Sequence, residues 1–285
     1  MIVTLGGSSG FVGRTLQKKI REKGWTLRNV SREDFSLSDE EFSAKIVEGA
    51  DAVINLAGAP ISKKWNETWK KEILDSRRLT TGKFVRAMAT AKVRPVVFIN
   101  ASATGIYDSI GTHTETSAAF SDSFLGRVCR EWETEALSAE SFTRVVLMRT
   151  GMVLGKNGGA LEKMYFPFSI GIGGKIGNGR QIISFIHLED LVNVYLFALE
   201  TPSLTGVVNA VSPFPVTNAE FTDTLGKVLN QPTWMTIPAF ALKLLYGEGA
   251  QILLEGQKVL PEKLESAGFR FLFPTIRNSL VQIYR

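Results

Sequence analysis

Short apolar runs alternate with longer amphipathic stretches through the first 200 residues of the chain. Runs of strand length occupy residues 2–5, 25–30, 51–58, 95–101 and 144–149. Helical periodicity, with apolar residues recurring every three to four positions, covers about 66–91 and 124–139, and a further helix opens at 185–190 and runs to about 199. Strands that alternate with helices of this length predict right-handed crossovers, and hence an α/β fold with a doubly wound parallel sheet of the Rossmann type.

The first apolar run breaks into a glycine turn, Gly7-x-x-Gly10-x-x-Gly13, and an amphipathic stretch follows it. Glycines let backbone N–H groups approach a pyrophosphate, and the following helix directs its positive N-terminal dipole at the same anion. The motif carries weight because it directly follows a strand and opens a helix; a glycine-rich turn without a ligand is the alternative. We therefore predict dinucleotide binding by Gly7, Ser9, Gly10, Phe11, Val12 and Gly13.

The end of the second strand decides which dinucleotide is expected. An NAD site usually places a carboxylate about 20 residues past the glycines, on the ribose hydroxyl. Here that position holds Ser31 and Arg32, which suit a 2′-phosphate, and Arg14 adds a second positive charge. Glu33 and Asp34 follow, so a one-residue shift would restore an acidic contact, and Asp34 could also face the adenine. The alternative is that the two arginines are solvated surface residues. We expect NADP(H) rather than NAD(H).

Composition excludes several other classes of protein. One cysteine (Cys129) and two histidines among 285 residues leave no basis for a disulfide or a Cys/His metal site, so no metal is expected. The net charge is only +5, and the basic pairs lie among acidic residues, so we expect no nucleic-acid partner. No apolar run reaches the roughly 18–20 residues that span a bilayer. Met1 leads directly into a strand, without a signal or transit peptide, so a cytoplasmic location is expected.

Small or polar residues follow each of the five predicted strands. In a parallel sheet these carboxyl ends share one edge, where ligands bind. The residues are Gly7 to Gly13, Ser31 and Arg32, Ala57 and Gly58, Ser102, and Thr150 and Gly151. That edge is the predicted cleft.

The character of the chain changes after Gly151. Residues 171–179 contain five glycines and are either a flexible surface loop or part of a substrate lid that spans 156–185. His187 and Asp190 are expected to cap and brace the helix that follows. We predict a Rossmann-type domain over residues 1–215, including that lid, and a mostly helical C-terminal lobe over 216–285.

Seven segments give the chain a family resemblance from end to end. It resembles the epimerase-like branch of the extended short-chain dehydrogenases/reductases, and within it an atypical subfamily described as nucleoside-diphosphate-sugar epimerases or cell-division-inhibitor-like proteins. The C-terminal segment at 254–261 is similar to that subfamily's own extension. The segments are residues 7–13, 53–58, 65–69, 102–107, 147–155, 186–190 and 254–261.

The resemblance implies further roles for individual residues. Ser31 and Arg32 match the pair that holds the 2′-phosphate in such proteins. The turn Leu56, Ala57 and Gly58 would pack on the adenosine side, and Arg77 in the next helix would support cofactor binding. Val153, past the fifth strand, lies where the nicotinamide is expected.

The catalytic positions depart from the superfamily pattern. Active relatives pair a serine with a Tyr-x-x-x-Lys, whose tyrosine is the general acid/base. Ser102 matches the serine, but the tyrosine and lysine positions hold Leu125 and Cys129, and we assign Cys129 to packing. Tyr107 is the best substitute acid, with its pKa lowered by Lys175 or Arg180; a buried tyrosine with a satisfied hydroxyl is the alternative.

Two functions follow from these expectations. The first is an NADP-dependent oxidoreductase or epimerase acting on a small polar substrate, such as a nucleotide sugar, with Ser102 and Tyr107 as catalytic residues. The second is a non-catalytic NADP-binding regulator that acts through a protein partner. A homo-oligomer is compatible with either.

Overall fold

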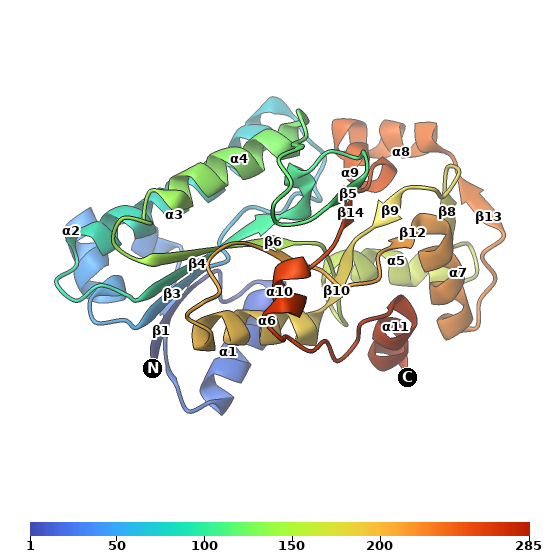
Figure 1. Cartoon of the computed structure of the whole chain (residues 1–285). Coiled ribbons are helices and arrows are strands. Elements are labelled where there is room, and N and C mark those ends of the chain that lie inside the picture. The colour runs from blue at the N-terminus through green and yellow to red at the C-terminus, as the bar shows by residue number, and fades with distance from the viewer.

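Six parallel strands form the central sheet of the computed structural model, which describes residues 1–285 (Figure 1). Their spatial order is β11-β6-β4-β3-β1-β2. The five predicted strands are confirmed, and β11 is a sixth that the hydrophobic pattern did not reveal. The strands are β1 (Ile2–Gly6), β2 (Thr26–Val30), β3 (Ala52–Asn55), β4 (Val97–Ala103), β6 (Arg144–Thr150) and β11 (Gly206–Ala210).

Helices cover both faces of this sheet (Figure 1). Consecutive residues of one strand point to opposite faces, so Ile54 joins one core and Val53 the other. Burial on both faces explains why the strands read as continuous apolar runs and not as alternating ones. One face carries α1 (Phe11–Glu22) and α6 (Leu188–Glu200), and the other carries α3 (Glu67–Thr90) and α4 (Phe124–Leu137).

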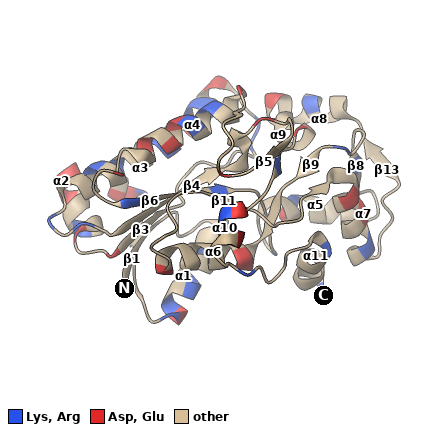
Figure 2. Ribbon diagram, viewed as in Figure 1, with Lys and Arg blue, Asp and Glu red and all other residues tan.

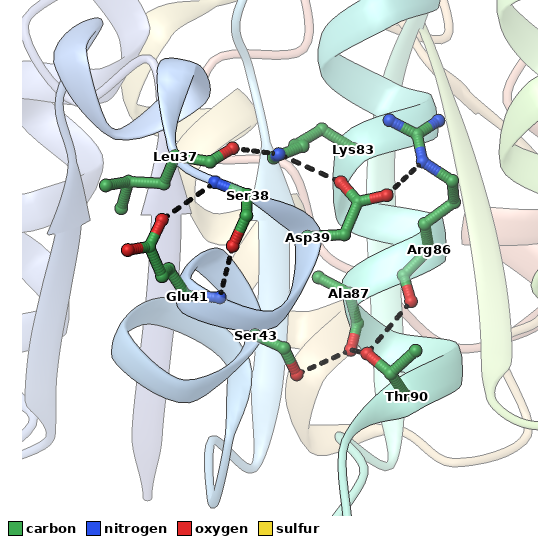
Figure 3. A network of polar contacts seen from close by, with 9 residues as sticks. All are labelled: Leu37, Ser38, Asp39, Glu41, Ser43, Lys83, Arg86, Ala87 and Thr90. Carbon is green, nitrogen blue, oxygen red and sulfur yellow. Dashed lines mark hydrogen bonds and ion pairs between the residues drawn. The ribbon is translucent and has the colours of Figure 1, made fainter.

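The connection between β2 and β3 is held against α3 by a polar network, shown in Figure 3. Ser38 and Glu41 form a reciprocal capping box that starts α2. Asp39 pairs with Lys83 at 2.9 Å and with Arg86 at 2.7 Å, both on α3. This connection contains η1 (Glu33–Ser36), α2 (Asp39–Phe42) and the π-helical turn η2 (Ser43–Val47).

The C-terminal lobe has a third core of its own. This core joins the predicted lid segment to the C-terminal helices, because Leu161 and Phe168 pack in one cluster with Phe221 and Leu280. The domain division at residue 215 stays a prediction. The helices of the lobe are α5 (Gly159–Ser169), α7 (Asn218–Leu229), α8 (Ala239–Tyr246), η4 (Gly247–Ala250), α9 (Gln251–Leu254) and α11 (Ile276–Tyr284).

Short strand pairs complete the structure around the lobe. The glycine-rich segment 171–179 is not only a loop, because its residues Gly174–Ile176 form β8, which pairs in parallel with β13. The remaining short elements are η3 (Thr104–Ile106), β5 (Thr112–His113), β7 (Met152–Leu154), β9 (Ile182–Ile183), β10 (Phe185–His187), β12 (Val216–Thr217), β13 (Met235–Ile237), β14 (Lys258–Val259) and α10 (Glu262–Ser266).

His187 and Asp190 brace the chain, as predicted. The Nδ1 atom of His187 accepts a hydrogen bond from the backbone N–H of Glu189 at the start of α6. The carboxylate of Asp190 accepts the backbone N–H groups of Leu272 and Phe273, at 2.7 and 2.9 Å. Asp190 therefore ties α6 to the C-terminal segment, and His187 does the same through its Nε2 atom, 2.8 Å from Gln282 Oε1.

None of the helices combines the length and apolar character that crossing a bilayer requires. Figure 2 shows basic and acidic residues side by side along α3 and α4.

Candidate functional site

The glycine turn after β1 forms a tight backbone cradle at the start of α1. Gly7 has a φ of +77°, and a Cβ there would lie 2.7 Å from the backbone of Leu56. A Cβ on Gly13 would lie 2.3 Å from the carbonyl oxygen of Gly7. Gly10 differs, because it is exposed and its Cβ would meet only that same oxygen, at 3.2 Å. Two glycines therefore shape the turn, and the third keeps its outer surface free of side-chain atoms, as a pyrophosphate site requires.

Phe11 links this turn to the loop that follows β7. Its ring fills the space beside Gly158, where a Cβ would lie 2.2 Å from the ring. Val153, in β7, pairs with Ile186 of β10 and lies beside the same loop. Ser9 is exposed, and its carbonyl accepts a hydrogen bond from Arg14 at 3.1 Å. The roles of Ser9, Phe11 and Val153 toward a cofactor stay predictions.

At the end of β2, Asp34 and Arg32 lie in different environments. The carboxylate of Asp34 is buried and accepts hydrogen bonds from the backbone N–H and the hydroxyl of Ser31, at 2.7 and 2.8 Å. Lys45 also pairs with it at 2.5 Å, and these hydrogen bonds, that of Lys45 foremost, lower the pKa of Asp34. Arg32 is exposed and makes no hydrogen bond or ion pair. Glu33 is exposed as well and makes no ion pair, so Arg32 and Glu33 both carry free charges at this strand end, and only the Asp34 carboxylate is buried and paired.

Arg77 supports the turn after β3 from below. Its guanidinium donates to the carbonyls of Ala59 and Ile73, at 3.1 and 3.0 Å. The same group lies 3.1 Å from the point where Gly58 would carry a Cβ, and it stacks over the Trp132 ring. Burial lowers the pKa of Arg77. Arg77 therefore positions the Leu56–Gly58 turn.

A buried ionic network lies under the carboxyl ends of β4, β6 and β11. Arg149 donates two hydrogen bonds to the carboxylate of Glu133, at 2.8 and 2.6 Å. Ser102 donates its hydroxyl proton to the same carboxylate at 2.6 Å. A carboxylate that is paired with an arginine is ionised and only accepts hydrogen bonds, so Ser102 donates its single hydroxyl proton to Glu133. That proton is then not available to stabilise an oxyanion.

Tyr107 belongs to the same network, and its role as the general acid stays a prediction. The side chain is fully buried. Its hydroxyl accepts from Arg149 at 2.8 Å and has two acceptors within reach of its proton, Asn209 Oδ1 at 2.9 Å and the Thr114 carbonyl at 3.0 Å. Burial raises the pKa of Tyr107, and the cation beside it is Arg149, not Lys175 or Arg180. The alternative stated from the sequence, a buried tyrosine with a satisfied hydroxyl, describes its environment.

Ser102 is also buried, because the residue is only 4% exposed. The position of the missing tyrosine, Leu125, is half-buried in an apolar cluster with Trp65 and Phe124. Cys129 packs beside Ile106 and Tyr107, and burial raises the pKa of its thiol to about 11. The packing role predicted for Cys129 is confirmed.

Sequence reasoning missed Glu133, Arg149 and Asn209. One signal was available, because Arg149 directly follows the buried apolar residues Val145 to Met148 in β6. A buried charge requires a partner, so an arginine in this buried strand indicates that a carboxylate lies nearby. Nothing in the spacing identified Glu133 as that partner.

A hollow of about 710 Å³ lies in the C-terminal lobe, between the turn after β8 and the segment from α8 to α9. Lys243, Glu248, Gln251 and Glu255 are among its lining residues, together with Ile176.

The parallel sheet, the glycine cradle and the free arginine define a dinucleotide-binding protein of the Rossmann class. Residues 2–210 match the NAD dependent epimerase/dehydratase family, and the chain belongs to that family. Residues 237–283 match a domain of unknown function, DUF1731. These residues include α8, α9, α10 and α11.

Relatives of similar length exist in plants, bacteria and animals. The chain is 42% identical to "Epimerase family protein SDR39U1 homolog, chloroplastic" of Arabidopsis thaliana, over 98% of this chain and 86% of the relative. It is 38% identical to an epimerase family protein of Mycobacterium leprae, over 98% and 94% of the two chains. The crystal structure of human epimerase family protein SDR39U1 with NADPH superposes with a TM-score of 0.92 at 34% identity, covering 100% of this chain and 99% of the human one. One relative is chloroplastic, and the cytoplasmic location stays a prediction.

Proposed function

We propose that this chain binds NADPH at the carboxyl edge of its sheet and that Arg32 selects it over NADH. The observation that carries the proposal is the arrangement at the end of β2, where the Arg32 side chain is exposed without a partner and Asp34 is buried and neutralised by Lys45, which leaves Glu33 as the exposed carboxylate beside Arg32. A carboxylate in this place would repel a 2′-phosphate, whereas a free guanidinium binds it by charge-assisted hydrogen bonds. The human relative that was solved with NADPH supports the same cofactor.

The surrounding residues fit that cofactor. The cradle of Gly7, Gly10 and Gly13 would hold the pyrophosphate, and the turn of Leu56 to Gly58 would pack on the adenosine side. The hydroxyl proton of Ser31 is already donated to Asp34, so Arg32 is the main anchor for the phosphate. When bound, NADPH supplies a hydride for transfer.

Fluorescence titration of Arg32→Glu with both cofactors tests the proposal. We expect NADPH affinity to fall by about ten- to hundredfold, which corresponds to the loss of a charged hydrogen bond of roughly 1.5–3 kcal/mol. NADH affinity should change little. Arg270→Glu is a matched control, because Arg270 is also exposed and makes no hydrogen bond or ion pair. Equal affinity of the native protein for NADPH and NADH would overturn the assignment.

For the bound cofactor we propose an oxidoreductase or epimerase role that works without a tyrosine acid. The two lobes and the cofactor cradle support a reductase-type site, but Ser102 and Tyr107 are both engaged below it. Since general acid catalysis contributes typically about 10²–10⁴ in rate, turnover should be slow.

The same engaged hydroxyls favour the second candidate, a non-catalytic NADPH-binding regulator with a protein partner. NADPH consumption measured over a panel of carbonyl compounds separates the two roles. Consumption that depends on Arg32 supports the oxidoreductase. Because an epimerase returns the hydride to its substrate and consumes no cofactor, tight NADPH binding supports the regulator only where neither consumption nor an epimerised product is found.

A further inference from the structure

A hollow of about 390 Å³ lies between α7 and α11 in the C-terminal lobe. The two helices pack through one core, to which α7 contributes Leu225 and Val228 and α11 contributes Ile276 and Leu280. Figure 1 shows these helices next to each other in the lobe, away from α1 and the glycine cradle. The hollow is therefore separate from the proposed cofactor site.

Every charged side chain that lines this hollow is basic, and we call it the basic hollow. Lys227 comes from α7, while Arg277 lies in the first turn of α11 and Arg285 directly follows its last residue. Arg277, Val281 and Arg285 recur at intervals of four residues, so they lie along one side of that helix. The lining residues are Thr224, Lys227, Val228, Arg277, Val281 and Arg285.

Only one of the three cations has a counter-ion. Lys227 pairs with Asp223, one turn earlier on α7, at 2.6 Å. Arg277 and Arg285 are exposed, and their guanidinium groups make no hydrogen bond or ion pair. Two positive charges thus line one hollow without a carboxylate partner. A recess lined by charge of one sign raises the local concentration of ions of the opposite sign.

The chemistry of the free cations favours a phosphate group as the anion. A guanidinium presents a planar fork of N–H donors, which matches the oxygens of a phosphate. A phosphate ester carries about −1.5 to −2 charges and three acceptor oxygens, so one such group neutralises both free arginines, whereas a single carboxylate neutralises only one. Val228 and Val281 also line the hollow and provide apolar contact for the carbon atoms of a small molecule.

We propose that the basic hollow binds the phosphate or diphosphate group of a small soluble molecule, at a site separate from the cofactor. Its volume is within the range of small-molecule sites, which is roughly 300–1,000 Å³. This inference does not rest on the proposed function, because none of the lining residues belongs to the cradle or to the end of β2.

Isothermal titration of the NADPH-saturated full chain with inorganic pyrophosphate tests the proposal, since NADPH then fills the cradle. We expect pyrophosphate to bind and acetate not to bind. Arg277→Gln and Arg285→Gln should each lower pyrophosphate affinity by about tenfold, because each removes charge-assisted hydrogen bonds. Arg270→Gln is the matched control, since Arg270 is also exposed and unpaired but lies outside the hollow. NADPH affinity should not change in any of the three variants.

Failure of pyrophosphate to bind the native chain, or equal affinity in the native chain and both hollow variants, would overturn the proposal. Co-sedimentation with phosphatidylglycerol vesicles is a second arm. Binding to vesicles without binding of pyrophosphate would assign the arginines to a membrane surface and also overturn it. Thermal melting checks that the variants are folded, as expected for substitutions at exposed positions. If NADPH itself does not bind, the proposed function fails, and loss of pyrophosphate affinity in the hollow variants still supports the basic hollow as the anion site.

Discussion

Arg149 and Glu133 form a bidentate ion pair in which both side chains are at most 7% exposed. The pair joins β6 to α4, and through Ser102 and Tyr107 it also reaches β4 and β11. An ion pair at this depth is satisfied by several hydrogen bonds at once, which is the condition under which a buried pair is tolerated. The network around this pair is structural, and it fills the space below the positions that are catalytic in active relatives.

Glu133→Gln should therefore destabilise the fold. The amide keeps the size of the carboxylate but leaves the Arg149 charge without its counter-ion. Removing one partner of a buried pair costs typically about 3–5 kcal/mol, and urea denaturation measures that loss in free energy of unfolding. The exposed pair of Lys227 and Asp223 provides the control, because Lys227→Met should cost no more than about 1 kcal/mol. Equal effects of the two substitutions would show that the buried pair contributes little.

Tyr107→Phe should lower stability without changing NADPH affinity. The substitution leaves Arg149 Nη1 short of one acceptor, and it removes the proton that Asn209 Oδ1 and the Thr114 carbonyl have within reach. We expect a loss of about 1–3 kcal/mol in free energy of unfolding. Tyr246→Phe is the matched control, because the Tyr246 hydroxyl makes no hydrogen bond and its loss should cost no more than about 0.5 kcal/mol. A large fall in NADPH oxidation at unchanged stability would instead return Tyr107 to a catalytic role.

His187 should make the fold less stable in mild acid. Burial lowers the pKa of His187 below its ordinary value of 6.5, so the unfolded chain binds the proton more readily than the folded one. The stability from the neutral imidazole is therefore present above pH 6.5 and is lost as the pH falls through the folded pKa. The slope cannot exceed about 1.4 kcal/mol per pH unit for one group.

Urea denaturation of the native chain and of His187→Gln, between pH 8 and pH 5, tests this prediction. The glutamine keeps a polar side chain next to Gln282 but does not titrate in this range. The difference between the two curves isolates His187 from other groups. Parallel curves would assign the acid sensitivity elsewhere.

The sequence identified the parts of the fold that depend on local pattern. Gly7 to Gly13 follow a strand and open a helix, so their position in the chain determined the cradle. Strand β11 was missed because it begins at Gly206 and its short apolar run is interrupted by Asn209. It is recognisable only through its pairing with β6, more than 50 residues away in the chain.

The candidate site was harder to predict because its chemistry depends on long-range contacts. The Tyr107 hydroxyl meets Asn209, 102 residues further along the chain. Ser102 and Tyr107 share the same strand end, as expected. Packing of α4 brings Glu133 under Ser102 and engages its hydroxyl, while the Tyr107 hydroxyl is engaged by Arg149. Spacing predicts which residues share an edge, and it does not predict which of them point into the core.

Gly10→Val and Gly13→Val should separate cofactor binding from folding. At Gly13 a Cβ would lie 2.3 Å from the Gly7 carbonyl oxygen, so the turn and α1 must shift and the fold should be strongly destabilised. At Gly10 the nearest atom is 3.2 Å away and φ is −70°, so a side chain is tolerated by the fold. Its branches would nevertheless project from the cradle where a pyrophosphate must approach. We expect Gly10→Val to melt near the native temperature and to lose NADPH binding in fluorescence titration. Normal NADPH affinity in a folded Gly10→Val protein would show that the phosphates bind away from this turn.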